Sequence, residues 1–150
     1  MRIVLLAAGR LRRGPEKALV DDYLERFARA GRGLGLPPIS LLEVEGRAAE
    51  PDAVLAAVPS GAALVALDER GTEATSPEFA DRLAAWRDDA RDVCFVIGGA
   101  DGLAPAIRDR ADLTLSFGRM VWPHMLARVM LAEQLYRAAS ILAGSPYHRA

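Results

Sequence analysis

The sequence is poor in several residue types, and each shortage excludes a class of protein. A single cysteine, Cys94, cannot form an internal disulfide, which argues against a disulfide-stabilised secreted domain. Two histidines and one cysteine make a zinc site improbable, and no spacing of acidic residues calls for another metal. The longest apolar run, Ile3–Ala8, is far shorter than the roughly 20 residues of a membrane-spanning helix. With no recognisable secretory signal, we expect a cytoplasmic protein without metal or membrane partner.

The sequence also lacks a large excess of positive or of negative charge. Nineteen Lys and Arg residues against twenty Asp and Glu residues give a net charge of −1, and Lys17 is the only lysine. Nucleic-acid-binding proteins usually carry a basic surface, so the overall charge does not favour that class. Residues 105–150 nevertheless hold six arginines and three acidic residues, so that part of the surface can be locally positive.

Short apolar segments and helical patterns alternate along the chain. Its 150 residues, 51% of them hydrophobic, suit a single domain over residues 1–150. We expect the Ser76 hydroxyl to cap the helix that starts there. The alternation predicts an α/β fold, with a mostly parallel sheet covered by helices on both faces. Strands are expected at residues 3–8, 39–44, 63–67, 93–97 and 112–116, and helices from Pro15, Pro51, Ser76, Pro105 and Pro123, with a loop at 45–50.

Ligands of parallel sheets bind beyond the carboxyl ends of the strands, and three segments fall there. These are the residues after Leu67, the turn Gly98–Gly102 and the loop Phe117–Trp122. Glycines let a backbone approach a ligand closely, although a tight strand-to-helix turn explains the glycine-rich segment equally well. Large apolar side chains are unusual in an exposed loop, so a ligand, a partner chain or the folded-back tail is expected to cover Phe117–Trp122. A loop tucked under the chain's own core is the alternative.

The last helix is apolar on more than one face, and this predicts burial in a homodimer. Complete burial within one chain is the alternative. Glu133 and Arg137 have the spacing of an ion pair on this helix. The tail that follows ends with Tyr147, His148 and Arg149, which place a ring, a titratable base and a guanidinium side by side.

Several motifs resemble one family, the SPOUT-class methyltransferases that modify N3 of a pseudouridine in bacterial 23S rRNA. The most specific are the I-G-G-x-x-G-L turn at 97–103, the S-F-x-x-M-x-x-P-H loop at 116–124 and the Y-H-R tail at 147–149. The resemblance extends over essentially the whole chain. Two departures stand out. Residues 31–50 are short, rich in Gly, Ala and Pro and without lysine where relatives often carry more of it, and Trp122 stands where a smaller apolar residue is usual.

This resemblance implies a homodimer, a C-terminal trefoil knot and S-adenosylmethionine as methyl donor. It also implies 23S rRNA as the partner, which we expect to be presented in the large subunit or the whole ribosome. The cofactor contacts it implies are Leu67, Gly98, Gly99, Ser116, Phe117, Gly118, Arg119, Met120, Val121 and Trp122.

A mechanism follows from the same resemblance and from general chemistry. The imide N3 of the base must lose its proton, and His148 is the expected base. Arg149 is expected to stabilise charge on the carbonyls and Tyr147 to stack on the uracil. We expect the tail to dock over the partner subunit's cofactor, and Arg119 and Arg128 to contact phosphates.

Two other functions remain open at this point. A non-catalytic ribosome-associated or assembly factor would keep the helix for dimerisation and need no cofactor. A nucleotide-binding enzyme could use Gly98–Gly102 for phosphate, but no Lys or Arg stands beside these glycines. Methylation of a different RNA is a variant of the main hypothesis.

Overall fold

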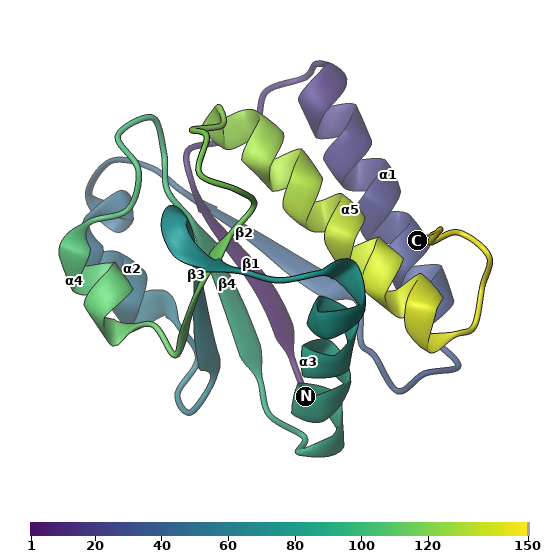
Figure 1. Ribbon diagram of the computed structural model, residues 1–150. Coiled ribbons are helices and arrows are strands. Elements are labelled where there is room, and N and C mark those ends of the chain that lie inside the picture. Colours follow the sequence, from purple (N-terminus) through teal and green to yellow (C-terminus); the bar gives the residue numbers. More distant parts are fainter. Residues whose placement is uncertain (150) are drawn as a thin grey trace.

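The computed structural model describes residues 1–149 and contains one five-stranded sheet (Figure 1). All neighbouring strands run parallel, in the order β2-β1-β4-β3-β5. Their carboxyl ends therefore meet at one edge of the sheet, as the predicted α/β fold requires. The strands are β1 (Ile3–Ala8), β2 (Ile39–Val44), β3 (Ala63–Glu73), β4 (Val93–Ile97) and β5 (Leu113–Ser116).

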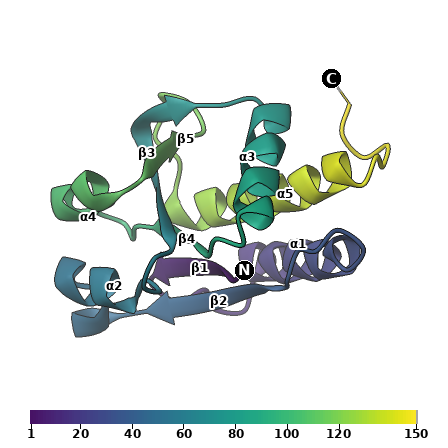
Figure 2. The same ribbon diagram turned by 90° about the horizontal axis from the view of Figure 1, so that it is seen from below.

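Helices cover both faces of the sheet, which confirms the predicted layers (Figures 1 and 2). One face carries α1 (Pro15–Gly31), α3 (Ser76–Asp88) and α5 (His124–Leu142). The other face carries α2 (Pro51–Ala57) and α4 (Pro105–Arg110). The segment expected as a loop at 45–50 contains a short 3-10 helix at Gly46–Ala49. The trefoil knot stays a prediction.

The central strand β4 shows why its sequence is an unbroken apolar run. Phe95 packs toward α1, α3 and α5, whereas Cys94 and Val96 pack toward α2 and α4. Because both faces are covered, alternate residues do not need to be polar. Burial also raises the pKa of the Cys94 thiol to about 12, so the thiol stays protonated at neutral pH.

Strand β3 is longer than the sequence pattern predicts. We expected it to end at Leu67, but it continues to Glu73 beside β5, with a register shift between Leu67 and Thr72. Gly71 permits this close pairing, because a Cβ atom there would lie 2.4 Å from the backbone oxygen of Thr114. The added residues are mostly polar and exposed, so hydrophobic alternation could not reveal them.

The start of α3 corrects a second expectation. The residue that caps this helix is Thr75, whose side chain accepts a hydrogen bond from the Glu78 backbone N–H, while the Glu78 carboxylate accepts one from Thr75 N–H. This reciprocal pair is a capping box. The Ser76 hydroxyl instead donates to Gln134 Oε1 of α5 at 2.8 Å, and so ties α3 to α5.

Helix α5 lies against both α1 and α3, and this packing uses most of its apolar surface. Leu131 and Leu135 are fully buried within the chain. Met125 and Leu126, near its start, remain exposed. Burial within one chain therefore explains the middle of the helix but not its first turn. Within residues 1–149, no helix combines the length and apolarity needed to cross a membrane.

Candidate functional site

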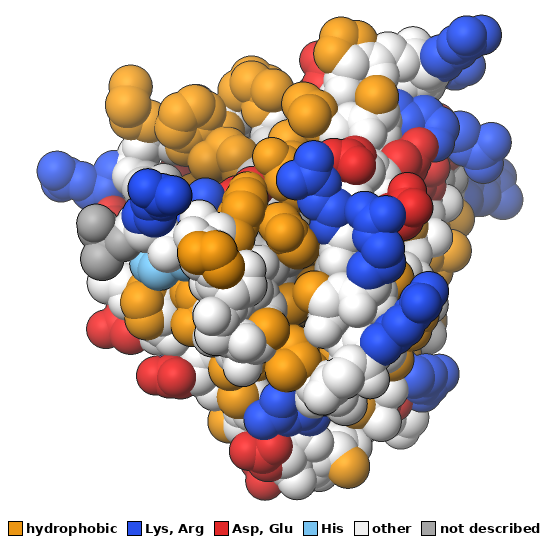
Figure 3. Space-filling view, turned by 90° about the vertical axis from the view of Figure 1, so that its right-hand side faces the viewer, with side chains coloured by type: hydrophobic (Ala, Val, Ile, Leu, Met, Phe, Trp, Pro, Cys, Tyr) orange, Lys and Arg blue, Asp and Glu red, His pale blue; other side chains and the backbone are white. Residues whose placement is uncertain are grey.

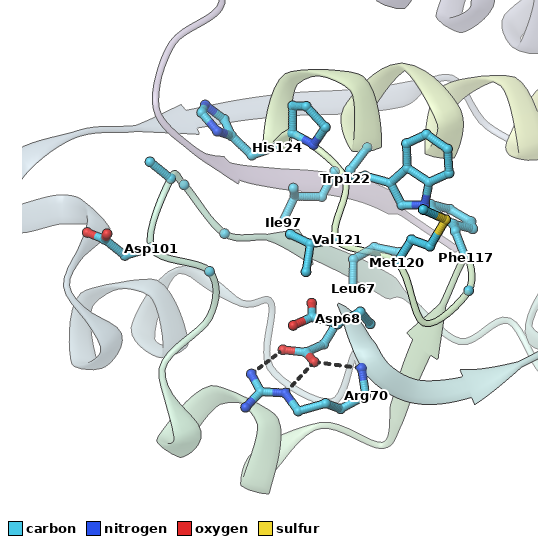
Figure 4. A pocket seen from close by; sticks show the side chains of 18 of the residues that line it. Leu67, Asp68, Arg70, Ile97, Asp101, Phe117, Met120, Val121, Trp122 and His124 are labelled. Atoms are coloured by element: carbon cyan, nitrogen blue, oxygen red, sulfur yellow. Dashed lines mark hydrogen bonds and ion pairs between the residues drawn. The ribbon is translucent and has the colours of Figure 1, made fainter.

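A cavity of about 590 Å³ opens at the carboxyl edge of the sheet (Figure 4). Its lining comes from the middle of β3 (Leu67–Arg70), the turn after β4 (Ile97–Gly102) and the loop after β5, together with the start of α5. These are the three segments that the sequence placed beyond strand ends. The volume lies within the range of ordinary small-molecule sites.

The cavity has an apolar centre with one charged side. Leu67, Ile97 and Val121 lie around its middle in Figure 4, and the Asp68 carboxylate lies below them. Predominantly apolar walls with a few placed polar groups are typical of cofactor sites. Ser116 and Arg119, both expected as cofactor contacts, are not among the lining residues.

The glycine-rich turn after β4 is closed on itself. A Cβ atom at Gly98 would lie 2.4 Å from the backbone carbon of Gly102, so only glycine fits there. Gly102 N–H donates to Gly99 O at 2.9 Å, and Gly102 has a positive φ of 76°. Gly99 is different, since a Cβ atom there would meet nothing closer than Ala8 O at 3.6 Å. Turn geometry therefore accounts for Gly98 and Gly102.

The loop after β5 is fixed at its base and open at its tip. The Ser116 hydroxyl accepts from Gly118 N–H at 3.0 Å and lies 3.2 Å from Glu69 O, so it joins this loop to β3. At the tip, Met120 and Val121 are 75% and 77% exposed, and Trp122 is also exposed. The alternative of a loop tucked under its own core is therefore wrong for these three residues. Nothing within residues 1–149 covers them.

Asp68 is a feature of the site that sequence reasoning did not single out. Its side chain is 3% exposed and accepts two hydrogen bonds from the Arg70 guanidinium, at 2.8 and 2.9 Å. These bonds, with the Arg70 backbone N–H and nearby Arg108, hold the pKa of the Asp68 carboxyl below its usual value. The cavity wall thus carries a carboxylate that is charged at neutral pH and paired with Arg70. Among residues 1–149, no three His, Cys, Asp or Glu side chains are grouped to hold a metal ion.

The tail packs on the C-terminal half of α5. The Tyr147 hydroxyl donates to Glu133 Oε1 at 3.0 Å, and its ring lies 4.6 Å from that of Tyr136. Arg137, which also forms the predicted pair with Glu133, lies over the Tyr147 ring and contacts His148 Nδ1 at 3.2 Å. Burial, together with the bond to Glu133, raises the pKa of Tyr147. A guanidinium can only donate, so His148 Nδ1 is the acceptor in this contact.

The tail and the cavity of the same chain lie at opposite ends of α5. Ala127 lines the cavity and Arg137 contacts the tail, and ten helical residues separate them by about 15 Å. Tyr147, His148 and Arg149 are absent from the cavity lining. One chain therefore does not bring its expected catalytic residues to its own cavity.

Arg128 has a role that the sequence did not suggest. We expected it to contact phosphate, but it is 1% exposed and donates to Glu43 Oε2 at 2.6 Å and to Gly9 O at 3.1 Å. That prediction is wrong, because the side chain is used to join α5 to the ends of β2 and β1. Its partner lies 85 positions away, which no local pattern can reveal.

The fold and the cavity at its carboxyl edge place this chain in a class of enzyme. It matches the family model described as "Predicted SPOUT methyltransferase" over residues 1–148, and it belongs to that family. It is 69% identical to the ribosomal RNA large subunit methyltransferase H of Cereibacter sphaeroides and 66% identical to that of Paracoccus denitrificans. Both alignments cover 99% of this chain and 99% of the relative.

A solved structure agrees with the family at the level of the fold. The probable methyltransferase from Bordetella pertussis Tohama I superposes with a TM-score of 0.55 at 18% sequence identity. The match covers 92% of this chain and 96% of that one. This likeness confirms the predicted α/β fold. The family match and the two relatives named above confirm the predicted SPOUT methyltransferase class.

Proposed function

We propose that this chain transfers the methyl group of S-adenosylmethionine to N3 of a pseudouridine in 23S rRNA. The whole chain acts as one methyltransferase domain, and the substrate is presented in the large subunit or the whole ribosome, in the cytoplasm. The names of the relatives support large-subunit rRNA as the substrate. The observation that carries the proposal is the cavity that the three strand-end segments form together.

The cavity suits a nucleoside-containing methyl donor. Its volume accommodates a ligand of that size, and Leu67, Ile97 and Val121 offer an apolar surface for a purine ring. Gly118 has a φ of 121° and open space where a Cβ atom would stand, so its backbone can approach a ligand closely. S-adenosylmethionine supplies an electrophilic methyl group on a positively charged sulfur. The lining carries three acidic side chains, Asp68, Glu69 and Asp101, against one guanidinium, that of Arg70, and this balance favours a cation.

Proton removal is assigned to the tail. In the arrangement described above, the Nδ1 lone pair of His148 is engaged by Arg137. Release of this contact would free Nδ1 to take the N3 proton. The N3 electron pair would then form the bond to the methyl carbon while the methyl–sulfur bond breaks, and the sulfur would leave as a neutral thioether. Arg149, which is exposed, stabilises charge on the uracil carbonyls, and Tyr147 stacks on the ring.

A homodimer completes the site in this proposal. Since the tail of one chain lies about 15 Å along α5 from its own cavity, the tail of a second chain is the simpler source of His148. An exposed apolar patch at the cavity end supports a partner there. Figure 3 shows hydrophobic side chains gathered on the upper part of the α1–α5 side, at the level where α5 begins. The patch consists of Met120, Val121, Trp122, Met125 and Leu126.

A complementation experiment tests this proposal. One chain lacks residues 146–150, and the other carries Gly98→Ala, which disrupts the turn at the cavity. Each is expected to be inactive alone on ribosomes from a strain that lacks the modification. If random pairing gives half mixed dimers with one complete site each, a 1:1 mixture recovers about a quarter of the unmodified activity.

Each negative result contradicts a different part of the proposal. Absence of S-adenosylmethionine binding by the unmodified chain in calorimetry contradicts methyl transfer and favours a non-catalytic ribosome-associated factor. Binding without methylation of these ribosomes contradicts the substrate. Activity of the chain without residues 146–150 contradicts the role of the tail, and no recovery in the mixture contradicts a site shared between subunits.

A further inference from the structure

The loop between β1 and α1, residues 9–14, concentrates positive charge on a nearly neutral chain. Arg10, Arg12 and Arg13 are all exposed. None of the three forms an ion pair or a side-chain hydrogen bond with any residue from 1 to 149. We call these residues the basic loop. Arginines that form no ion pair within residues 1–149 remain available to a ligand with negative charge.

The basic loop is built into the fold rather than left loose. Leu11 is 7% exposed, and its N–H donates to Glu43 Oε2 at 2.6 Å. Buried Arg128 donates to the same carboxylate oxygen and also to Gly9 O. Gly9 N–H in turn donates to Val44 O at 2.7 Å. An internal arginine thus holds a loop whose own arginines face solvent.

The arginines stand at the end of α1 where positive charge is least favourable. The helix begins at Pro15, and its N-cap residue, Gly14, provides no side-chain hydrogen bond. A helix N-terminus carries partial positive charge, so cations there repel it and one another. Glu16 is the only acidic residue of the first turn, and Lys17 is already paired with Asp21. Glu16 and the Glu43 carboxylate beside Leu11 offset only part of this repulsion, and a bound anion relieves more of it.

The basic loop also lies at the same edge of the sheet as the cavity. It follows β1, and Ala8 O lies 3.6 Å from the position of a Cβ atom on Gly99 in the cavity wall. Figure 1 shows the start of α1 and the start of α5 at the same end of the molecule. We propose that Arg10, Arg12 and Arg13 bind backbone phosphates of the RNA next to the nucleotide in the cavity. This inference rests on the proposed function.

RNA is the polyanion that this geometry favours. Guanidinium groups bind phosphate oxygens through paired hydrogen bonds, and three of them within four residues match a ligand with repeated charges. The basic loop then replaces buried Arg128 as the source of phosphate contacts. The basic loop provides a locally positive surface, although the net charge of the whole chain is −1.

The test compares two double variants that remove the same charge. Arg12→Ala/Arg13→Ala removes two arginines of the basic loop, whereas Arg32→Ala/Arg82→Ala removes two exposed arginines at the far end of α1 and on α3. The basic-loop variant is expected to raise KM for ribosomes roughly tenfold, with kcat and the Kd for S-adenosylmethionine within about twofold of the unmodified chain. The control variant is expected to change KM less than about twofold.

Binding measured without catalysis separates this inference from the proposed function. Co-sedimentation with ribosomes is followed over a range of salt concentrations, and the slope of log affinity against log salt is expected to fall by about 1–2 in the basic-loop variant. Equal losses in both variants, or none in either, overturn the inference whether or not methyl transfer occurs. An Arg12→Lys/Arg13→Lys variant is expected to recover most of the affinity, and a melting curve checks that each variant is folded.

Discussion

The two ends of α5 differ in almost every property that matters for a site. At the start of the helix, the cavity is open, and apolar side chains such as Met125 and Leu126 are exposed. At its far end, Tyr147 is packed between Tyr136 and Arg137 and is hydrogen-bonded to Glu133. The start of α5 borders an open cavity that a ligand can enter, whereas the end of α5 is covered by the chain's own tail.

This difference indicates how the work is divided within the proposed enzyme. Donor binding needs a hollow with apolar walls, and proton removal needs a titratable group that can move toward the base. The fold places the first at one end of a 19-residue helix and the second at the other. In the proposed homodimer, a single helix therefore sets the spacing between the two functions, and a second copy of the chain brings them together.

The largest expected effect comes from the tail. His148→Gln is expected to lower the rate of methyl transfer by about 10²–10⁴-fold, the range typical of a lost general base, without loss of S-adenosylmethionine binding. The chain offers a matched comparison, because its other histidine, His124, lines the cavity at the opposite end of α5. His124→Gln is expected to cost less than tenfold in single-turnover assays. The reverse order would place the base at the cavity end.

The next effect concerns the two arginines of α5. Arg128→Leu leaves Glu43 without its buried partner and is expected to lower the free energy of unfolding by about 3–5 kcal/mol. Arg137→Leu removes a more exposed pair at the other end and is expected to cost about 1 kcal/mol or less. Urea unfolding of both variants measures the difference. Equal costs would show that the first turn of α5 is not anchored by Arg128.

A smaller effect is expected within the cavity turn. Gly98→Ala forces a Cβ atom against the Gly102 backbone, and the resulting strain is expected to cost about 1–3 kcal/mol of stability. Affinity for S-adenosylmethionine is expected to fall more than tenfold. Gly99→Ala has room for its Cβ atom and serves as the control, with little change in either quantity. Tail packing, followed by the NMR signals of the Tyr147 ring, should be unaffected by both variants.

The smallest effect depends on pH. The pKa of Asp68 is lowered in the folded chain, so its charged form stabilises the fold above the unfolded pKa of about 3.9, and this contribution is lost as the pH falls toward the folded value. Asp68→Asn is expected to lower the free energy of unfolding by about 1–2 kcal/mol at neutral pH. The difference between variant and unmodified chain should shrink below about pH 4. A difference independent of pH would contradict the charged role.

The sequence predicts the strands and the cavity better than it predicts the charged contacts. The runs at β1 and β4 are apolar throughout because they are buried on both faces, and this pattern is local. Once parallel strands are expected, Gly98 and Val121 must follow strand ends at one edge, and Leu67 reaches the same edge although β3 continues past it. These residues were therefore placed correctly from sequence, while their contacts with a cofactor stay predictions.

Contacts between distant segments could not be predicted in this way. Arg128 lies three and seven positions before buried Leu131 and Leu135, so helical spacing already places it on the inner face of α5. What the spacing does not reveal is its partner, Glu43 of β2. The extension of β3 beyond Leu67 depends on Gly71 next to Thr114, a pairing set by β5. Arg70 was missed for the same reason, because it lies in that extension.

The parallel sheet has a practical consequence for expressing the protein. Met1 precedes β1 at the edge opposite the cavity, so a purification tag joined there would extend away from the bound donor. A tag joined after residue 150 would instead lengthen the segment that carries His148. Recombinant material intended for activity measurements is therefore best tagged at the amino terminus.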